Sequence, residues 1–266
     1  MRLPPRSIIP NLFTVMNLFS GFIAIKTAFV DHDYIAAGWF IVLGALFDTL
    51  DGLMARLTKS ASDFGVELDS LADVVTFGVA PSAIVYELYF SRIAEPWSLL
   101  ISALPAICGA LRLARFNSQL VGYDKEYFKG LPIPSAAILI VSFISFYYLE
   151  PSRLAAINVS PEMGLWVVII GASMLMVSTV RYESMPKFSG RGIKEKPLLF
   201  GGFVIGLVTA IVTKGVAIFP LFSAFILFGV IRFFIERIAK LAKHRRAEAL
   251  FDEEELERED EATFGA

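Results

Sequence analysis

Four aspartates stand at short intervals in a strongly apolar part of the chain: Asp48, Asp51, Asp69 and Asp73. Carboxylates are costly inside a lipid bilayer and are seldom found there without a function. Clustered carboxylates repel one another unless cations join them, and all-oxygen ligand sets favour hard divalent ions such as Mg²⁺ and Mn²⁺. Two such ions about 4 Å apart are used in phosphoryl chemistry. The four residues therefore predict a two-metal site for a phosphorylated ligand.

The spacing of these aspartates predicts which helix faces carry them. Residues three or four apart share one face of a helix, so the first two aspartates align on one helix and the last two on the next. The connector LTKSASDFG is short, which makes the two helices antiparallel neighbours whose carboxylates can converge. Beside them, Gly52 would let a phosphorylated ligand approach the backbone, and Arg56 offers a guanidinium suited to phosphate oxygens.

The composition indicates an all-α polytopic membrane protein. The 266 residues are 56% hydrophobic and only 19% charged, which is too apolar for an ordinary soluble domain. A spanning helix needs about 20 mostly apolar residues, and no nucleic-acid partner is expected. We predict about eight transmembrane helices, near residues 11–30, 34–56, 66–90, 96–117, 134–150, 162–182, 197–214 and 216–236.

The distribution of charge predicts domains and orientation. Short polar connectors indicate one transmembrane domain, residues 1–240, and the basic and then acidic residues 241–266 are expected to form a disordered cytoplasmic tail. Lysines and arginines concentrate in the segments on the same side as the N-terminus. The positive-inside rule therefore places both termini and the opening of the aspartate cluster in the cytoplasm. A bacterial inner membrane, with its lipids as surroundings, is the expected location.

Written out, the stretch from Asp48 to Asp73 reads Asp-x2-Asp-Gly-x2-Ala-Arg-x8-Gly-x3-Asp-x3-Asp. It resembles the signature of the CDP-alcohol phosphotransferase family, with every fixed position filled. The resemblance implies the fold of that family, with a six-helix core, and a reaction in which a hydroxyl displaces CMP from a CDP-linked lipid or alcohol. It also implies two divalent cations, Mg²⁺ or Mn²⁺, bound by the four aspartates, with Asp73 additionally matching the general base.

Further segments extend this resemblance over most of the chain. VVTFGVAPS, LRLARFN, FKGLPIPSAA and the opening PNLFTVMNLFSG are similar to the bacterial membrane-embedded phosphatidylserine synthases, a branch of the family. That similarity implies CDP-diacylglycerol as donor, L-serine as acceptor, phosphatidylserine and CMP as products, and a homodimer. The positions that match contacts to the CDP portion of the donor are Ile9, Pro10, Asn11, Gly52, Arg56 and Ser62.

The serine acceptor would bring a carboxylate and an ammonium group that need partners. Arg112 and Arg115 are three residues apart at the inner end of the predicted fourth span, so they share a helix face. We predict that at least one of them binds the serine carboxylate or the lipid phosphate, with Asn117 and Lys129 as further candidates. Anchoring at the inner membrane surface is the alternative explanation of both arginines.

Two other functions are compatible with the sequence. A sister transferase could use glycerol 3-phosphate or inositol phosphate, with Lys59, Arg112 and Arg115 as the additional bases that a phosphorylated acceptor would require. A divalent-cation transporter could also carry intramembrane aspartates. A transporter, however, should place its carboxylates near the midplane with access from both sides, whereas here they cluster in the predicted cytoplasmic half.

Overall fold

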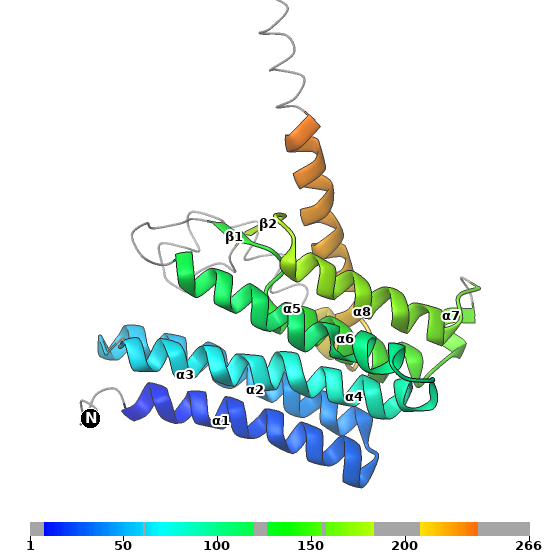
Figure 1. Cartoon of the computed structure of the whole chain (residues 1–266), viewed down its shortest axis with the longest axis horizontal. Coiled ribbons are helices and arrows are strands. Elements are labelled where there is room, and N and C mark those ends of the chain that lie inside the picture. The colour runs from blue at the N-terminus through cyan, green and yellow to red at the C-terminus, as the bar shows by residue number, and fades with distance from the viewer. Residues whose placement is uncertain (1–7, 61, 120–126, 156–157, 184–207, 239–266) are drawn as a thin grey trace, which may run out of the picture. The chain divides into compact units, whose positions relative to one another are not determined.

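A computed structural model of the chain describes residues 8–60, 62–119, 127–155, 158–183 and 208–238 (Figure 1). The chain forms two compact units, Met1–Ala224 and Phe225–Ala266. In the second unit the described residues 225–238 are helical, and Arg232 Nε donates a hydrogen bond of 2.9 Å to Glu236 Oε1 one turn later. All four aspartates lie in the first unit.

Within the described residues, five helices are long and apolar enough to cross a membrane: Ile8–Asp31, Tyr34–Thr58, Asp63–Leu88, Trp97–Ser118 and Ile218–Ile238. Two shorter apolar helices, Ile133–Tyr148 and Pro161–Val177, match the fifth and sixth predicted spans. The prediction of a mainly helical integral membrane protein is thus confirmed. The span at 197–214 and the tail at 241–266 lie mostly or wholly outside the described residues. The count of eight, the six-helix core and the boundary at residue 240 therefore stay predictions.

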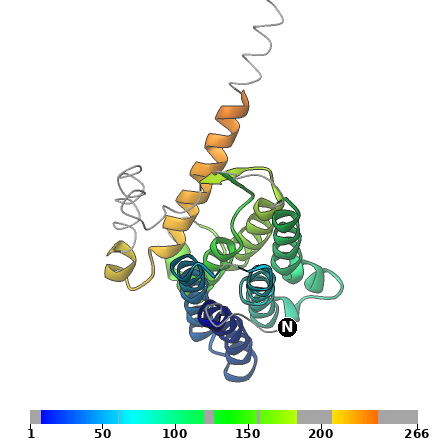
Figure 2. The ribbon, with the colours of Figure 1, turned by 90° about the vertical axis from the view of Figure 1, so that its left-hand side faces the viewer.

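The helices of the first unit lie side by side, and Figure 2 shows several of them nearly end on. α3, η3 and α4 form one continuous span, and α1 packs against both α2 and α3. The π-helical turns η2, η3 and η5 each continue the α-helix before them, and η4 is a 3₁₀ turn. In chain order the elements are α1 (Ile8–Lys26), η2 (Thr27–Asp31), α2 (Tyr34–Thr58), α3 (Asp63–Asp73), η3 (Val74–Val79), α4 (Ala80–Leu88), η4 (Phe90–Arg92), α5 (Trp97–Gln119), β1 (Tyr127–Lys129), α6 (Ile133–Phe143), η5 (Ile144–Tyr148), α7 (Ser152–Ala155), α8 (Pro161–Val177) and β2 (Arg181–Glu183).

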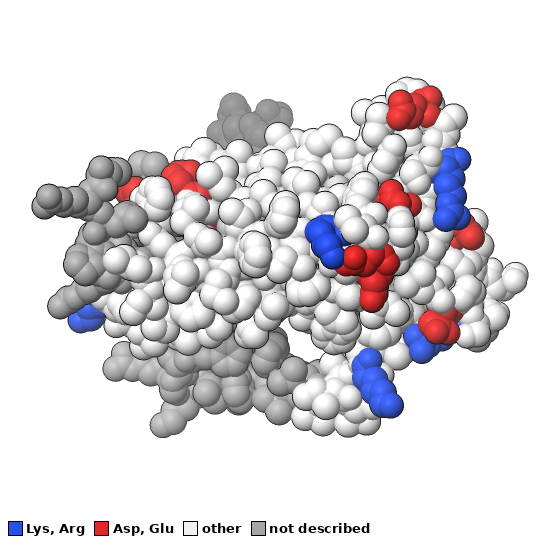
Figure 3. Space-filling view, turned by 90° about the horizontal axis from the view of Figure 1, so that it is seen from below, with Lys and Arg blue, Asp and Glu red and all other residues white. Residues whose placement is uncertain are grey.

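The described surface seen in Figure 3 has a broad uncharged region left of its centre, and most of its charged side chains lie over the right-hand half. Large apolar side chains are exposed along α1 and α2, among them Phe19, Phe22, Trp39 and Leu46. In water such a surface would be unfavourable, but the hydrocarbon core of a bilayer, about 30 Å thick, requires it. The surface therefore agrees with a membrane location.

Local sequence explains where the two aspartate-bearing helices begin and end. Asp33 caps α2 by accepting a 2.9 Å hydrogen bond from the backbone N–H of Ala36. Ser62 caps α3 by accepting one of 3.1 Å from the backbone N–H of Gly65. α2 ends at Lys59, whose φ of 50° breaks the helical path. The chain turns back between these two ends and carries the second pair of aspartates toward the first.

α1, α2 and η3 approach one another closely around Thr76, which is fully buried. A Cβ added to Gly44 would lie 2.6 Å from Thr76 Cγ2, and one added to Gly21 would lie 2.6 Å from Thr76 Oγ1. The Thr76 hydroxyl donates a 2.9 Å hydrogen bond to the backbone oxygen of Asn17. Small residues allow membrane helices to pack this closely. The contact fixes α1 against the turn that directly follows Asp73.

We expect Gly44→Ala to destabilise the protein by about 1–3 kcal/mol, because the added methyl group would collide with the Thr76 side chain, which has no free space to move into. Thermal unfolding in detergent measures the effect. Gly171→Ala on α8 is the matched control, since a Cβ there meets nothing within 4 Å and alanine is the better helix former. Equal unfolding midpoints for the two variants would contradict the close packing.

Besides the helices, the described residues include one short strand pair, in which β1 and β2 pair antiparallel with Lys129 opposite Arg181. Gly130 follows the first strand and donates a 2.8 Å backbone hydrogen bond to Val180. Its φ is 84°, and an added Cβ would collide with the carbonyl oxygen of Met176. Backbone groups outside a helix need partners of their own, and this segment finds them beside the end of α8.

Candidate metal centre

Three of the four aspartates bring possible ligand atoms together. One carboxylate oxygen from each of Asp48, Asp51 and Asp69 lies within 4.8 Å of the other two. Asp48 and Asp69 are also close enough for a hydrogen bond between their carboxyl groups. Oxygen atoms at this spacing can surround one divalent ion with small adjustments, since Mg–O distances are about 2.0–2.1 Å and Ca–O distances about 2.3–2.6 Å. The structure thus brings the two helices' aspartates together.

Asp73 lies one turn beyond Asp69 on α3 and is 8% exposed. Its charge interacts with those of the other three aspartates, although the 4.8 Å group is formed by those three. Asn17 Nδ2 on α1 donates a 3.2 Å hydrogen bond to Asp73 Oδ1. Asp73 is therefore close to the cluster, although its oxygens do not belong to the closest group of three.

The donor set fits a hard divalent cation. Asp69 Oδ1 is buried, and no hydrogen-bond partner reaches it within the described part of the chain. A buried carboxylate oxygen without a partner is unfavourable, and burying ionised carboxylates together is more so. A divalent cation would supply the missing partner and offset the repulsion among the carboxylates. Asp48, Asp51 and Asp69 are the residues placed to bind it.

α1 supplies two polar residues that the sequence analysis missed. Thr14 Oγ1 lies 2.9 Å from Asp51 Oδ2 and 3.2 Å from the carbonyl oxygen of Pro10. The hydroxyl therefore donates its hydrogen bond to the Asp51 carboxylate or shares it between these two acceptors. Asn17 holds Asp73 as described above. A signal was present in the sequence, because polar residues at positions 14, 17 and 20 repeat every three residues along an otherwise apolar span.

The predicted donor contacts Gly52 and Arg56 lie together on α2. A Cβ added to Gly52 would lie 3.8 Å from Arg56 Nη1, so the guanidinium extends back over the glycine. The Arg56 side chain is exposed and sits one turn beyond Asp51. An exposed guanidinium close to the carboxylates suits the oxygens of a diphosphate.

The remaining predicted donor contacts lie where α1 and α3 begin. Asn11 Oδ1 is 3.4 Å from a Cβ placed on Gly65, and the buried Asn11 Nδ2 has no hydrogen-bond partner in the described structure. Ser62 accepts the capping bond at the start of α3, which leaves its hydroxyl proton for a ligand. Pro10 is buried, whereas the Ile9 side chain is 45% exposed and lies at the surface.

The two predicted acceptor-binding arginines occupy different environments. Arg112 is 7% exposed, its Nε is buried without a hydrogen-bond partner among the described residues, and its charge attracts that of Asp73. Arg115 instead donates hydrogen bonds to the backbone oxygens of Val177 at 2.9 Å and Ser178 at 3.2 Å. These oxygens belong to the end of α8, where helical carbonyls lack partners of their own. Arg112 is thus buried close enough to Asp73 for their charges to interact, and Arg115 caps the end of α8.

The other two predicted acceptor contacts are less directly placed. Asn117 Nδ2 donates a 3.0 Å hydrogen bond to Ser70 Oγ, which lies beside Asp69 on α3. The backbone of Lys129 forms part of β1, and its side chain lies outside the described structure. Asn117 therefore supports the helix that carries two of the aspartates.

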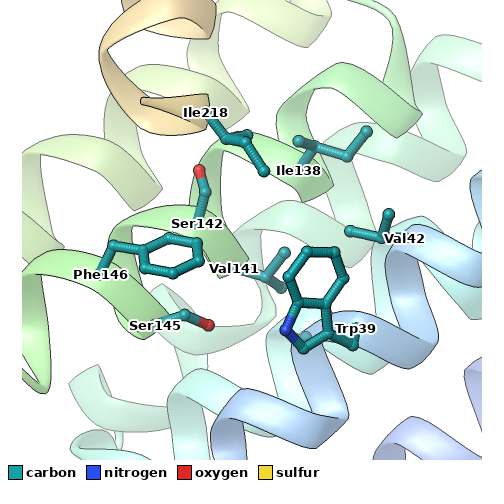
Figure 4. A pocket seen from close by; sticks show the side chains of 9 residues that line it. Trp39, Val42, Ile138, Val141, Ser142, Ser145, Phe146 and Ile218 are labelled. Atoms are coloured by element: carbon teal, nitrogen blue, oxygen red, sulfur yellow. The ribbon is translucent and has the colours of Figure 1, made fainter. Parts of the chain in front are cut away.

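A separate hollow lies between α2 and the helix formed by α6 and η5 (Figure 4). Trp39 and Val42 line one side, and Val141, Ser142 and Phe146 line the other. As far as the structure describes it, the lining holds no carboxylate. The hollow is thus distinct from the aspartate cluster.

Comparison with known proteins supports an interpretation of this geometry. A family model described as CDP-alcohol phosphatidyltransferase matches residues 7–180. A Helicobacter pylori (strain 26695) protein named CDP-diacylglycerol–serine O-phosphatidyltransferase is 36% identical over 239 residues, covering 87% of this chain and 93% of that protein. A Methanocaldococcus jannaschii protein of the same name is 39% identical over 181 residues, 67% of this chain and 75% of its own. The archaetidylserine synthase of Methanothermobacter thermautotrophicus is 36% identical over 189 residues, 69% of this chain and 72% of its own.

Proposed function

The chain belongs to the CDP-alcohol phosphatidyltransferase family, a group of transferases, and from this membership we propose that it transfers the phosphatidyl group of CDP-diacylglycerol to the hydroxyl of L-serine. The products are phosphatidylserine and CMP. The observation that carries the proposal is the convergence of Asp48, Asp51 and Asp69. Two relatives are named for the serine reaction with CDP-diacylglycerol, and the name of a third, archaetidylserine synthase, also points to serine.

The residues suggest how the reaction proceeds. The four aspartates would bind two divalent cations, Mg²⁺ or Mn²⁺, which when bound neutralise the diphosphate and stabilise the charge on the departing CMP. Asp73 accepts the proton of the serine hydroxyl, whose oxygen bonds to the lipid-side phosphorus. The bond from that phosphorus to the CMP oxygen then breaks. A hydroxyl is a poor nucleophile at neutral pH, so a positioned base is needed.

The surroundings of the cluster divide between donor and acceptor. We place the CDP portion of the donor over Gly52 and Arg56 and beside Asn11 and Ser62, with Ile9 and Pro10 on the approach. Family membership favours this transferase over the cation transporter. Arg56 agrees with that choice, because its guanidinium suits a diphosphate and would repel a permeating cation. For the acceptor carboxylate, Arg112 is the favoured partner because its buried Nε is unpaired in the described structure.

We expect Arg112→Ala to raise the KM for L-serine about tenfold or more, because a hydrogen bond to a charged group contributes about 1.5–3 kcal/mol. Serine-dependent CMP release over a range of serine concentrations measures this. Arg115→Ala is the comparison: it should lower the thermal stability, because it frees carbonyls of α8, and change the serine KM less than about threefold. The assignment is wrong if Arg115→Ala has the larger effect on KM.

An acceptor panel tests the proposed function. Purified protein in detergent receives CDP-diacylglycerol, Mn²⁺ or Mg²⁺, and in turn L-serine, glycerol 3-phosphate and inositol phosphate. CMP release that needs both metal and L-serine supports the proposal. Release with a phosphorylated acceptor instead would retain the transferase site and overturn the acceptor. Release with none would favour the transporter, which Mn²⁺ uptake into sealed vesicles would then reveal.

We further propose that both termini and the aspartate cluster face the cytoplasm of the inner membrane and that the protein is a homodimer. The orientation is supported by the concentration of lysines and arginines in the segments on one side of the spans. The dimer is supported by the family resemblance.

A further inference from the structure

We propose that Asn17 is a positioning residue, which holds Asp73 in the orientation that removes the acceptor's proton; this inference rests on the proposed function. Asn17 is fully buried in a span that could have been apolar throughout, and its Nδ2 donates a 3.2 Å hydrogen bond to Asp73 Oδ1. Burying an amide among apolar helices is unfavourable unless its hydrogen bonds are formed. The hydrogen bond to the Asp73 carboxylate therefore offsets the cost of burying the Asn17 amide.

The unpaired half of the amide strengthens this argument. Asn17 Oδ1 is buried and has no hydrogen-bond partner within the described residues, and a Cβ added to Gly44 would lie 3.0 Å from it. An ionised carboxylate can only accept, so the amide must direct its nitrogen toward Asp73 and leave its oxygen toward α2. A residue kept only for packing would not carry this cost, since an apolar side chain of similar size would avoid it.

Asn17 is also fixed from its main chain. Its backbone oxygen accepts the 2.9 Å hydrogen bond from Thr76, which lies in η3 directly after Asp73. Gly21 and Gly44 leave no free space around Thr76. The amide and the carboxylate are therefore carried by elements that are packed and hydrogen-bonded together, as an oriented catalytic group requires.

Asn17 binds one of the two carboxylate oxygens of Asp73. An amide holds Asp73 Oδ1 without carrying a charge and leaves Oδ2 for the proton. Thr14, one turn earlier on the same face of α1, makes the equivalent contact to Asp51. α1 thus donates a hydrogen bond to one carboxylate on each of the two aspartate-bearing helices.

The test compares Asn17→Ala and Asn17→Asp with Ser20→Ala. Ser20 is buried on the same face of α1, but its hydroxyl donates to the backbone oxygen of Met16 within the helix. Turnover is expressed per donor-binding site, counted with labelled CDP-diacylglycerol and Mn²⁺, so that unfolded protein does not contribute. We expect kcat to fall about 10²-fold in both Asn17 variants, as misplaced catalytic groups do, and to be unchanged in Ser20→Ala.

The kinetic constants separate positioning from binding or packing. The KM for L-serine and the Mn²⁺ affinity should stay within about threefold of the wild-type values. Asn17→Asp keeps the side-chain volume, so a cavity cannot explain its loss of turnover. A kcat within about threefold of wild type in both variants overturns the proposal, and so does loss of donor binding in both, because Asn17 would then be structural.

Failure of the proposed function has a different signature. In that case the wild-type protein itself releases no CMP with L-serine. If the wild type uses another acceptor, the same comparison is made with that acceptor, and the outcome for Asn17 is judged there.

Discussion

Asp69→Asn is expected to abolish divalent-metal binding and to lower serine-dependent CMP release by about 10³-fold or more, since a bound metal contributes several kcal/mol of charge stabilisation. Asp69 is close enough to hydrogen-bond Asp48 and belongs to the 4.8 Å group with Asp51. Its buried Oδ1 is also the atom that lacks a partner in the described structure. Asparagine keeps the size of the side chain but removes its charge, so packing is preserved while the ligand is weakened.

Mn²⁺ binding to the purified protein, followed by electron paramagnetic resonance, measures the first effect, and CMP release measures the second. Glu67→Gln is the matched control, because Glu67 is exposed on the same helix two residues away and loses the same charge. It should leave both quantities within about threefold of wild type, since isolated surface charges contribute little. Retained Mn²⁺ affinity in Asp69→Asn, or an equal loss in Glu67→Gln, would contradict the metal assignment.

The cluster could be predicted from the sequence because its geometry is mostly local. Intervals of three and four residues fix which aspartates share a helix face, and the short connector returns the second helix to the first. Asp48, Asp51 and Asp69 converge for that reason. The family signature then added chemistry that spacing alone could not supply.

The contribution of α1 was missed because it depends on packing. Which face of the first span meets α2 and η3 is decided by the close contacts of Gly21 and Gly44 with Thr76. Only that choice brings Thr14 and Asn17 to the carboxylates. Periodic polar residues in an apolar span indicate a buried face, but not which partners that face will find.

The two arginines show the same limit. Helical spacing gives Arg112 and Arg115 equivalent positions, yet the carbonyl oxygens at the end of α8, more than 60 residues away, engage Arg115. The strand pair has a similar origin, because the partner of β1 is β2, which follows α8 in the chain. Long-range contacts of this kind leave little trace in local sequence patterns.

Asp73→Asn should lower kcat about 10³-fold, within the range found for general acid–base catalysis, while donor binding persists and the Mn²⁺ affinity falls less than in Asp69→Asn. The physical reason is position: Asp73 is engaged by Asn17 on α1, and the group of close carboxylate oxygens is formed by Asp48, Asp51 and Asp69. An asparagine at position 73 can still accept a hydrogen bond from Asn17, but it cannot take the proton of the serine hydroxyl.

The contrast with Asp69→Asn separates chemistry from metal binding on one helix. Turnover and Mn²⁺ affinity should fall together in Asp69→Asn, whereas in Asp73→Asn turnover should fall much further than Mn²⁺ affinity. If Asp73→Asn loses Mn²⁺ as completely as Asp69→Asn, Asp73 acts as a metal ligand alone, and another group must receive the proton. If Asp73→Asn keeps more than about a tenth of wild-type turnover, the base is not Asp73, and the hydrogen bond from Asn17 serves the fold alone.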